Sequence, residues 1–346
     1  MPIRKSFSLI LIFLFMIQNG YTEVDSITDR IIRGAPVFLE TEDETVSLYA
    51  TDNIARVKNL HIPFTMDNHD SYWPIIEMRA GTVPLKMGFQ PCGLGVDMEA
   101  YTTFVRKIGG ADLERSVWNS IREETMAQYP DREPDKFLMN DIINRHLTSF
   151  RVYDIKINDI NMGQVDASFY DAQEYYDSDE DGVIGLLFFA NCDNIIIDYR
   201  NNEIVVNAPA ISSEGSPMRV LEGSCSIILT KVMINGVEQD AVIAPTASSV
   251  YLRDDYKSKK YYSDQEILSY CYNGKSRNPT DKYKNVTVDI DGITVHCKGY
   301  FTSRAKGEMA GEFLNHMMRK VNFLGYPVFK GHRIQFDLKQ GLFRMD

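Results

Sequence analysis

The chain has 346 residues, of which 44% are hydrophobic and 25% charged, a composition that excludes a disordered protein and is typical of a globular one. Its net charge of −11 and isoelectric point near 5.1 argue against a nucleic-acid partner, because nucleic acid requires a basic binding face. The length is sufficient for two hydrophobic cores of ordinary size.

The N-terminus has the pattern of a secretory signal peptide. Arg4 and Lys5 precede an apolar run over residues 9–17, and a short polar segment with the small residues Gly20 and Thr22 follows. The apolar run is too short to span a bilayer comfortably. We therefore expect that residues 1–22 are a signal peptide that is cleaved off. The mature protein is then secreted or periplasmic and has no stable membrane span. The alternative is that the segment is not cleaved and anchors the protein.

The first half of the remaining chain mixes strands with an apolar pattern at helical spacing. Residues 23–60 show no strong period, whereas residues 73–86 predict two strands joined at Gly81. Residues 98–128 carry apolar side chains at helical spacing, interrupted by Gly109 and Gly110. A short helix is expected over residues 137–146, and strands resume at residue 150.

The second half reads as strands with two further helical patches. Residues 208–217 are rich in Ser, Pro and Gly and are the best linker in the chain. Asn235-Gly236 between apolar runs predicts a hairpin. Helices are expected over residues 264–270 and 308–320, with strands between residues 286 and 297.

One pattern occurs twice, once in each half. In the first copy Gly185 follows two branched aliphatic residues and precedes aromatics, a β-branched run and Asp198. In the second copy Gly325 and Asp337 stand in the corresponding places. The glycine-to-aspartate spacing is 13 residues in the first copy and 12 in the second. We therefore predict two related lobes, over residues 23–207 and 218–346.

These closing segments resemble the second half of a lobe of the aspartic proteases of the pepsin and retropepsin type. In that family a lobe opens with a strand, a turn and a strand that ends in Asp-Thr-Gly, and closes with two hydrophobic residues and a glycine. The resemblance covers roughly residues 70–346. It implies a mostly β fold of two related aspartic-protease-like β-barrel lobes, with added helices in the first lobe.

The sequence departs from the family at the catalytic loops. The resemblance places Pro91, Cys92 and Gly93 in the opening motif of the first lobe. In the second lobe the opening motif consists of Ala244, Pro245 and Thr246. Pro91 and Ala244 then stand where the two aspartates belong. The family's chemistry needs two carboxylates that share one proton, so both working groups are missing. The nearest substitutes are Asp97, interpreted as a helix cap, and Asp240, placed at the start of a strand.

Two other sets of residues could carry metal or thiol chemistry. Asp177, Asp179 and Asp181 precede Gly182 as in the first half of a calcium loop, but Phe188 stands where the closing glutamate belongs. An acidic surface turn is therefore the simpler interpretation, and we expect no metal or other cofactor. The five cysteines are too few for a disulfide scaffold. A bridge between Cys271 and Cys297 and five buried thiols remain alternatives.

The sequence thus predicts an exported, catalytically inactive protein that binds an extended peptide or protein between its lobes, since grooves of this type hold peptides by strand addition. An active aspartic-type endopeptidase with displaced acids is one alternative. A structural envelope protein whose cleft is filled by side chains is the other.

Overall fold

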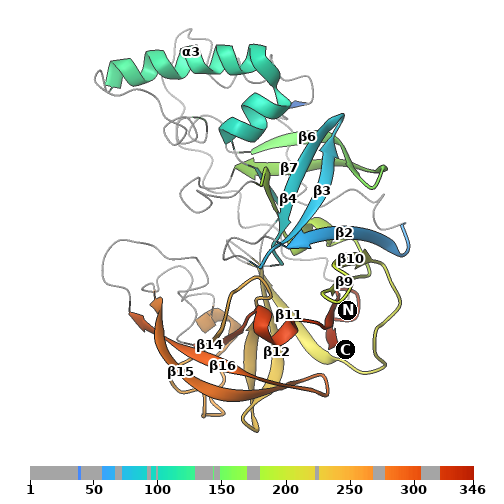
Figure 1. Cartoon of the computed structure of the whole chain (residues 1–346), viewed down its shortest axis with the longest axis vertical. Coiled ribbons are helices and arrows are strands. Elements are labelled where there is room, and N and C mark those ends of the chain that lie inside the picture. Colours follow the sequence, from blue (N-terminus) through green and yellow to red (C-terminus); the bar gives the residue numbers. More distant parts are fainter. Residues whose placement is uncertain are drawn as a thin grey trace.

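The computed structural model describes these residues: 38–39, 57–66, 72–91, 95–98, 100–128, 143, 149–169, 180–222, 226–267, 277–304 and 320–346. Within them the chain is mostly β, with two barrels joined by a shared sheet and with helices added to the first barrel (Figure 1). The predicted fold class, mostly β with two related barrel lobes and helices in the first, is confirmed.

The first barrel is a closed ring of six strands. In spatial order they are β3 (Pro74–Ala80), β4 (Val83–Phe89), β8 (Gly182–Ile184), β5 (Val96–Met98), β7 (Ile160–Phe169) and β6 (Ser149–Ile157), which pairs again with β3. The pairs β4–β8 and β5–β7 are parallel, and the other four are antiparallel.

The second barrel repeats this ring. Its strands are β12 (Ser226–Ile234), β13 (Val237–Ile243), β17 (Asn322–Leu324), β14 (Val250–Leu252), β16 (Ile293–Arg304) and β15 (Arg277–Ile290), which returns to β12. Here β13–β17 and β14–β16 are the parallel pairs. Both rings therefore have the same order and the same two parallel contacts.

The duplication extends to the register. Glu77 lies opposite Lys86 in the first barrel and Lys231 lies opposite Asp240 in the second, so both partners are offset by 154 residues. Each of these cross-strand pairs joins opposite charges, with the signs exchanged between the barrels. The β12–β13 turn at Asn235 and Gly236 has positive φ at both residues, 52° and 77°, as expected for Asn-Gly in a two-residue hairpin.

A second sheet joins the two barrels. Its six antiparallel strands run in the order β2 (Leu60–Met66), β10 (Glu203–Val206), β9 (Asn194–Asp198), β18 (Arg333–Asp337), β19 (Leu342–Met345) and β11 (Ser216–Glu222). The central pair, β9 with β18, places Ile196 opposite Gln335, at the approximate twofold axis of the molecule. The strand β11 starts at Ser216, inside the segment that we predicted to be linker.

The helices of the first lobe lie beyond the barrel, where α3 (Gly110–Gln128) forms the upper end of the molecule in Figure 1. It follows the π-helix η1 (Ala100–Ile108), and the break between them falls at the predicted glycines. Gly110 has φ of 76°, which a side chain would disfavour. In the second lobe a helical turn is described from residue 264 to 267.

Three short elements complete the described fold, namely β1 (Phe38–Leu39), the 3-10 helix η2 (Leu186–Phe189) and α6 (Tyr326–Phe329). Of the helices predicted over residues 137–146 and 308–320, only Ile143 and Lys320 belong to the described residues. None of the described helices is long and apolar enough to cross a membrane.

Candidate functional site

The candidate site consists of two equivalent loops, one after the second strand of each barrel. We call residues 90–95 the first motif loop and residues 244–249 the second motif loop. The N–H of Gln90 donates to the carbonyl of Ile184 at 2.9 Å, and the N–H of Ala244 donates to the carbonyl of Leu324 at 3.0 Å. These matching bonds make Gln90, and not Pro91, the counterpart of Ala244. The sequence alignment of the first motif loop was therefore wrong by one residue.

The second motif loop is held by backbone contacts. The N–H of Ala247 donates to the carbonyl of Ala244 at 2.9 Å, and the N–H of Tyr326 donates to the carbonyl of Ala247 at 2.8 Å. A Cβ atom on Gly325 would lie 2.2 Å from the carbonyl oxygen of Ser249, so only glycine fits against this loop. The closing glycine thus packs on the opening loop of its own barrel.

The first motif loop has the corresponding contact, since the N–H of Gly185 donates to the carbonyl of Gly95 at 2.7 Å. Gly182, three residues earlier, is constrained as well, because a Cβ atom there would lie 2.3 Å from the carbonyl oxygen of Asp97. Pro91 is buried, whereas Cys92 and Gly93 lie outside the described residues.

The two equivalent positions differ in their surroundings. Ala244 is fully buried in a small apolar cluster that contains Val242, Tyr251 and Phe323, and its neighbours Pro245 and Thr246 are buried too. Gln90 is only half-buried. Neither a primary amide nor a methyl group can exchange a proton near neutral pH, so the side chains at these two positions do not supply an acid and a base.

The two substitute acids lie at unrelated places. Asp97 is in the middle of β5, opposite Val183. The prediction that it begins a helix is therefore wrong. Asp240 is the middle residue of β13, and not at the start of the strand as the sequence had suggested. It lies opposite Lys231, and its carboxylate forms an ion pair with Arg219 at 3.1 Å. Desolvation raises the pKa of Asp240, and the nearby Arg219 opposes this shift. The strand positions of the two acids are not equivalent between the barrels.

The repeated aspartates cap turns of the shared sheet. Asp198 ends β9 and accepts hydrogen bonds from the backbone N–H groups of Arg200 at 2.8 Å and Asn201 at 3.0 Å. Asp337 ends β18 and accepts from the N–H of Gln340 at 2.8 Å. Asp337 also pairs with Arg344 at 2.7 Å, and both side chains are buried. These aspartates are therefore structural.

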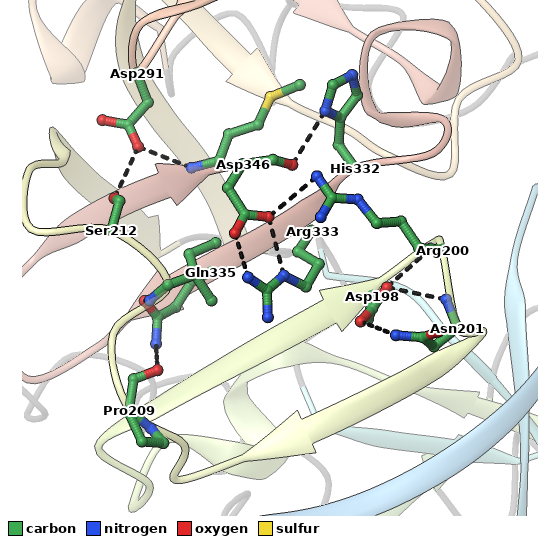
Figure 2. A network of polar contacts seen from close by, with 12 residues as sticks. Asp198, Arg200, Asn201, Pro209, Ser212, Asp291, His332, Arg333, Gln335 and Asp346 are labelled. Carbon is green, nitrogen blue, oxygen red and sulfur yellow. Dashed lines mark hydrogen bonds and ion pairs between the residues drawn. The ribbon is translucent and has the colours of Figure 1, made fainter.

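The junction of the barrels is further tied by polar contacts (Figure 2). Asp346 binds Arg333 of β18 and also Arg200 of the β9–β10 turn, at 3.4 Å, so one carboxylate joins segments from both halves. The hydrogen bond from Arg333 is the main cause that lowers the pKa of Asp346. Gln335 donates to the carbonyl of Pro209, which fixes the connection between the lobes.

Aromatic side chains also join the two lobes, which the sequence did not reveal. Tyr72, just before β3, stacks on Tyr326 of α6 with ring centroids 4.4 Å apart. Tyr326 meets Tyr199 edge-on at 5.4 Å, and Tyr199 meets Phe64 of β2. Because these residues are far apart in the chain, only tertiary structure brings them together.

Asp181 serves the fold and is paired with a lysine of the helix η1. Its two carboxylate oxygens accept from the N–H of Lys86 at 2.7 Å, from the hydroxyl of Thr103 at 3.2 Å and from the ammonium of Lys107 at 2.5 Å. The carboxylate thereby anchors the helix η1 to the barrel. Asp177 and Asp179 lie outside the described residues. Within the part of the chain that the structure describes, no group of three or more His, Cys, Asp or Glu side chains is arranged to hold a metal ion.

The described cysteines are not reactive groups. Cys192 is buried and burial raises its pKa to about 12, and burial likewise raises the pKa of Cys297 to about 11. Cys297 carries a free thiol, and Cys271, the other member of the predicted bridge, lies outside the described residues. A thiol with so high a pKa is protonated at neutral pH and is a poor nucleophile.

Fold and site together define a two-barrel, mostly β protein with a duplicated topology and two motif loops that lack carboxylates. No family model matches the chain, and no curated protein matches it. Among solved structures 254 chains match. One of these, described as "Crystal structure of edgp", is 10% identical with a TM-score of 0.44, and the match covers 84% of this chain and 95% of that chain. A likeness at this TM-score says nothing about function.

Proposed function

We propose that this chain is a catalytically inactive relative of the aspartic proteases of the pepsin and retropepsin type. In this proposal it is exported by its N-terminal signal and binds an extended peptide or protein segment between the barrels. The duplicated six-strand rings, the sheet that joins them and the closing glycines support the family assignment.

One observation carries the proposed loss of catalysis. The residues that follow β4 and β13 at equivalent backbone positions are Gln90 and Ala244, and neither has a carboxyl group. The family mechanism needs one carboxylate to activate water and a second, protonated one to donate to the peptide carbonyl. A glutamine and a methyl group can contact a peptide but cannot perform either step.

Two candidate functions remain beside this one. An active endopeptidase would require Asp97 and Asp240, and the ion pair of Asp240 with Arg219 disfavours it. A structural protein with a filled cleft is favoured by the burial of Ala244, Pro245 and Thr246.

The first test is digestion of a peptide library by the purified mature protein between about pH 3 and about pH 7. We expect no cleavage by the wild type, Asp97→Asn or Asp240→Asn. Cleavage by the wild type that either substitution abolishes would establish the alternative peptidase.

The second test is binding of the same library. Ser248 is exposed in the second motif loop, so Ser248→Trp should block an occupant of this site, whereas Ser213→Trp, at an exposed position of the connection, should not. Library binding that is lost in Ser248→Trp and kept in Ser213→Trp supports the proposal. If the wild type binds no peptide of the library, the peptide-binding proposal is wrong and the structural protein with a filled cleft is the remaining candidate.

A further inference from the structure

The strand β15 has one open edge within the described part of the chain. On one side it pairs with β16, and the two strands form a long hairpin (Figure 1). On the other side it pairs with β12 only at Val288 and Asp289. One further contact follows, in which Thr287 and Asn235 exchange two hydrogen bonds of 2.8 and 2.9 Å. Before Thr287, no described strand pairs with this side of β15.

The equivalent edge of the first barrel is covered. There β6 is the counterpart of β15, and it pairs with β3 at Ile155, as β15 pairs with β12 at Val288. The strand β1 continues along the same side of β6, opposite residues 151–152. This segment lies three to four residues before Ile155, and the same distance before Val288 reaches residues 284–285. In the described chain the second barrel therefore leaves open the edge that β1 closes in the first.

The open edge presents unpaired backbone groups to solvent. In an antiparallel ladder alternate residues direct their N–H and C=O groups to the same side, so Tyr283 and Asn285 direct theirs the same way as Thr287, away from β16. Both residues are exposed, Tyr283 to 45%. Such an edge is a template for pairing with another chain, and native proteins cover or block it.

The same edge contains the only Asn-x-Ser/Thr sequence of the chain in which x is not proline, Asn285-Val286-Thr287. Val286 is buried, so the side chains of Asn285 and Thr287 project from the outer face of β15. Lys298 lies opposite Asn285 on β16, but its ammonium is 4.5 Å from the ring centroid of Tyr283. Among the described residues none forms a hydrogen bond with the side-chain amide of Asn285, which is therefore accessible to modification.

We propose that Asn285 bears an N-linked oligosaccharide that covers the open edge of β15, as β1 covers the edge of β6. A glycan is bulky and strongly hydrated, so at this position it keeps a second strand away from the backbone of β15. The inference rests on the proposed export, because the sugar donor belongs to the secretory pathway.

The donor is an oligosaccharide linked to a lipid through pyrophosphate. Nδ2 of Asn285 forms a bond to the anomeric carbon of the first sugar, and the bond from that carbon to the pyrophosphate oxygen breaks. The lipid pyrophosphate leaves with the bonding electron pair, and Nδ2 loses one proton to a base of the transferring enzyme. The step involves no oxidation or reduction.

The first test asks whether the site is modified. The full chain is expressed in a eukaryotic secretory pathway, and its mobility on a gel is compared with and without an N-glycosidase. We expect a shift for the wild type and none for Asn285→Gln. The control is Asn285→Gln combined with His61→Thr, which places a threonine two residues after the exposed Asn59 and should restore a shift.

The control separates two failures. A shift in the control without a shift in the wild type would refute the modification of Asn285 and leave the proposed export intact. No shift in either chain would show that the protein is not exported, and both proposals would then be wrong.

The second test asks whether the glycan covers the edge, and it compares two variants that both lack the glycan. Asn285→Gln leaves the edge open, whereas Asn285→Pro removes an N–H that faces away from β16 and so blocks the edge without breaking the hairpin. In size-exclusion chromatography with light scattering, Asn285→Gln should form at least about threefold more associated protein than the glycosylated wild type. Asn285→Pro should stay within about 1.5-fold of the wild type.

Enzymatic removal of the glycan from the folded wild type should have the same effect as Asn285→Gln, and this experiment needs no substitution. Equal association of the glycosylated and deglycosylated wild type would overturn the covering role. So would association of Asn285→Pro as strong as that of Asn285→Gln, provided that thermal melting shows both variants to be folded.

Discussion

Placing an aspartate at each of the two equivalent motif positions should have very different consequences. Ala244 is fully buried among apolar side chains, whereas Gln90 is half-buried. A carboxylate introduced by Ala244→Asp would lose its hydration without gaining a partner, so its charged form would be strongly disfavoured. At Gln90→Asp water still reaches the side chain, and the effect should be small.

The magnitude for Ala244→Asp follows from linkage. Burial of a carboxyl group raises its pKa by up to about 3–5 units, and each unit corresponds to about 1.4 kcal/mol. A shift of about 3 units, from about 4 to about 7, lowers the free energy of unfolding at neutral pH by about 4 kcal/mol. Because the folded-state pKa is the higher one, this loss is complete above it and disappears below the unfolded-state pKa.

Urea denaturation near pH 4 and near pH 7.5 measures this difference. The free energy of unfolding of Ala244→Asp relative to wild type should fall between the two pH values, while Ala244→Asn, which does not titrate, should show the same deficit at both. Gln90→Asp should remain within about 1 kcal/mol of wild type. Equal costs for the two aspartates near pH 7.5, or a deficit at position 244 that does not depend on pH, would refute the described burial of this site.

Three further outcomes are expected. Gly325→Ala should lower the free energy of unfolding, measured by urea denaturation, by more than about 3 kcal/mol, because backbone oxygens occupy the space of the added Cβ atom. Gly81→Ala, at a residue with φ of 60° and open space around it, should lower it by about 1 kcal/mol. Similar losses for the two variants would contradict the packing of the closing glycine. Arg344→Leu should lower the free energy of unfolding by about 3–5 kcal/mol because it leaves Asp337 buried and unpaired, and adding Asp337→Leu should recover part of this loss, which a double-mutant cycle measures. Asn285 is exposed in an Asn-Val-Thr sequon, so expression in a eukaryotic secretory pathway should give a form that an N-glycosidase shifts on a gel, and no shift would count against export by the N-terminal signal.

The duplication could be predicted from the sequence because its signal is local. The strand, glycine, aromatics and aspartate around Gly185 recur around Gly325, and in each copy they stand within one short run of the sequence. Likewise the helix break near Gly110 follows from the conformational freedom of glycine. Features of this kind are visible without knowledge of the tertiary structure.

The details of the site were set by contacts distant in sequence, which a single sequence does not reveal. Gln90 is fixed opposite Ala244 by a hydrogen bond to Ile184, 94 residues later in the chain. Asp97 was interpreted as a helix cap, but β5 has strands on both sides that extend its backbone. Asp181 was read with its acidic neighbours, although Lys107 of the helical insertion neutralises it.

Under the proposed function, the architecture accounts for barrels that persist without a pair of catalytic acids. In the second motif loop the backbone N–H groups of Ala244 and Ala247 and the close approach of Gly325 define the loop, and none of these contacts uses the side chain at position 244. Two like-charged carboxylates in this place would oppose folding, since one must stay protonated or repel the other. The conformation of the second motif loop therefore does not depend on a carboxylate at position 244. The fold constrains the glycine at position 325 far more tightly than the residue that would perform catalysis.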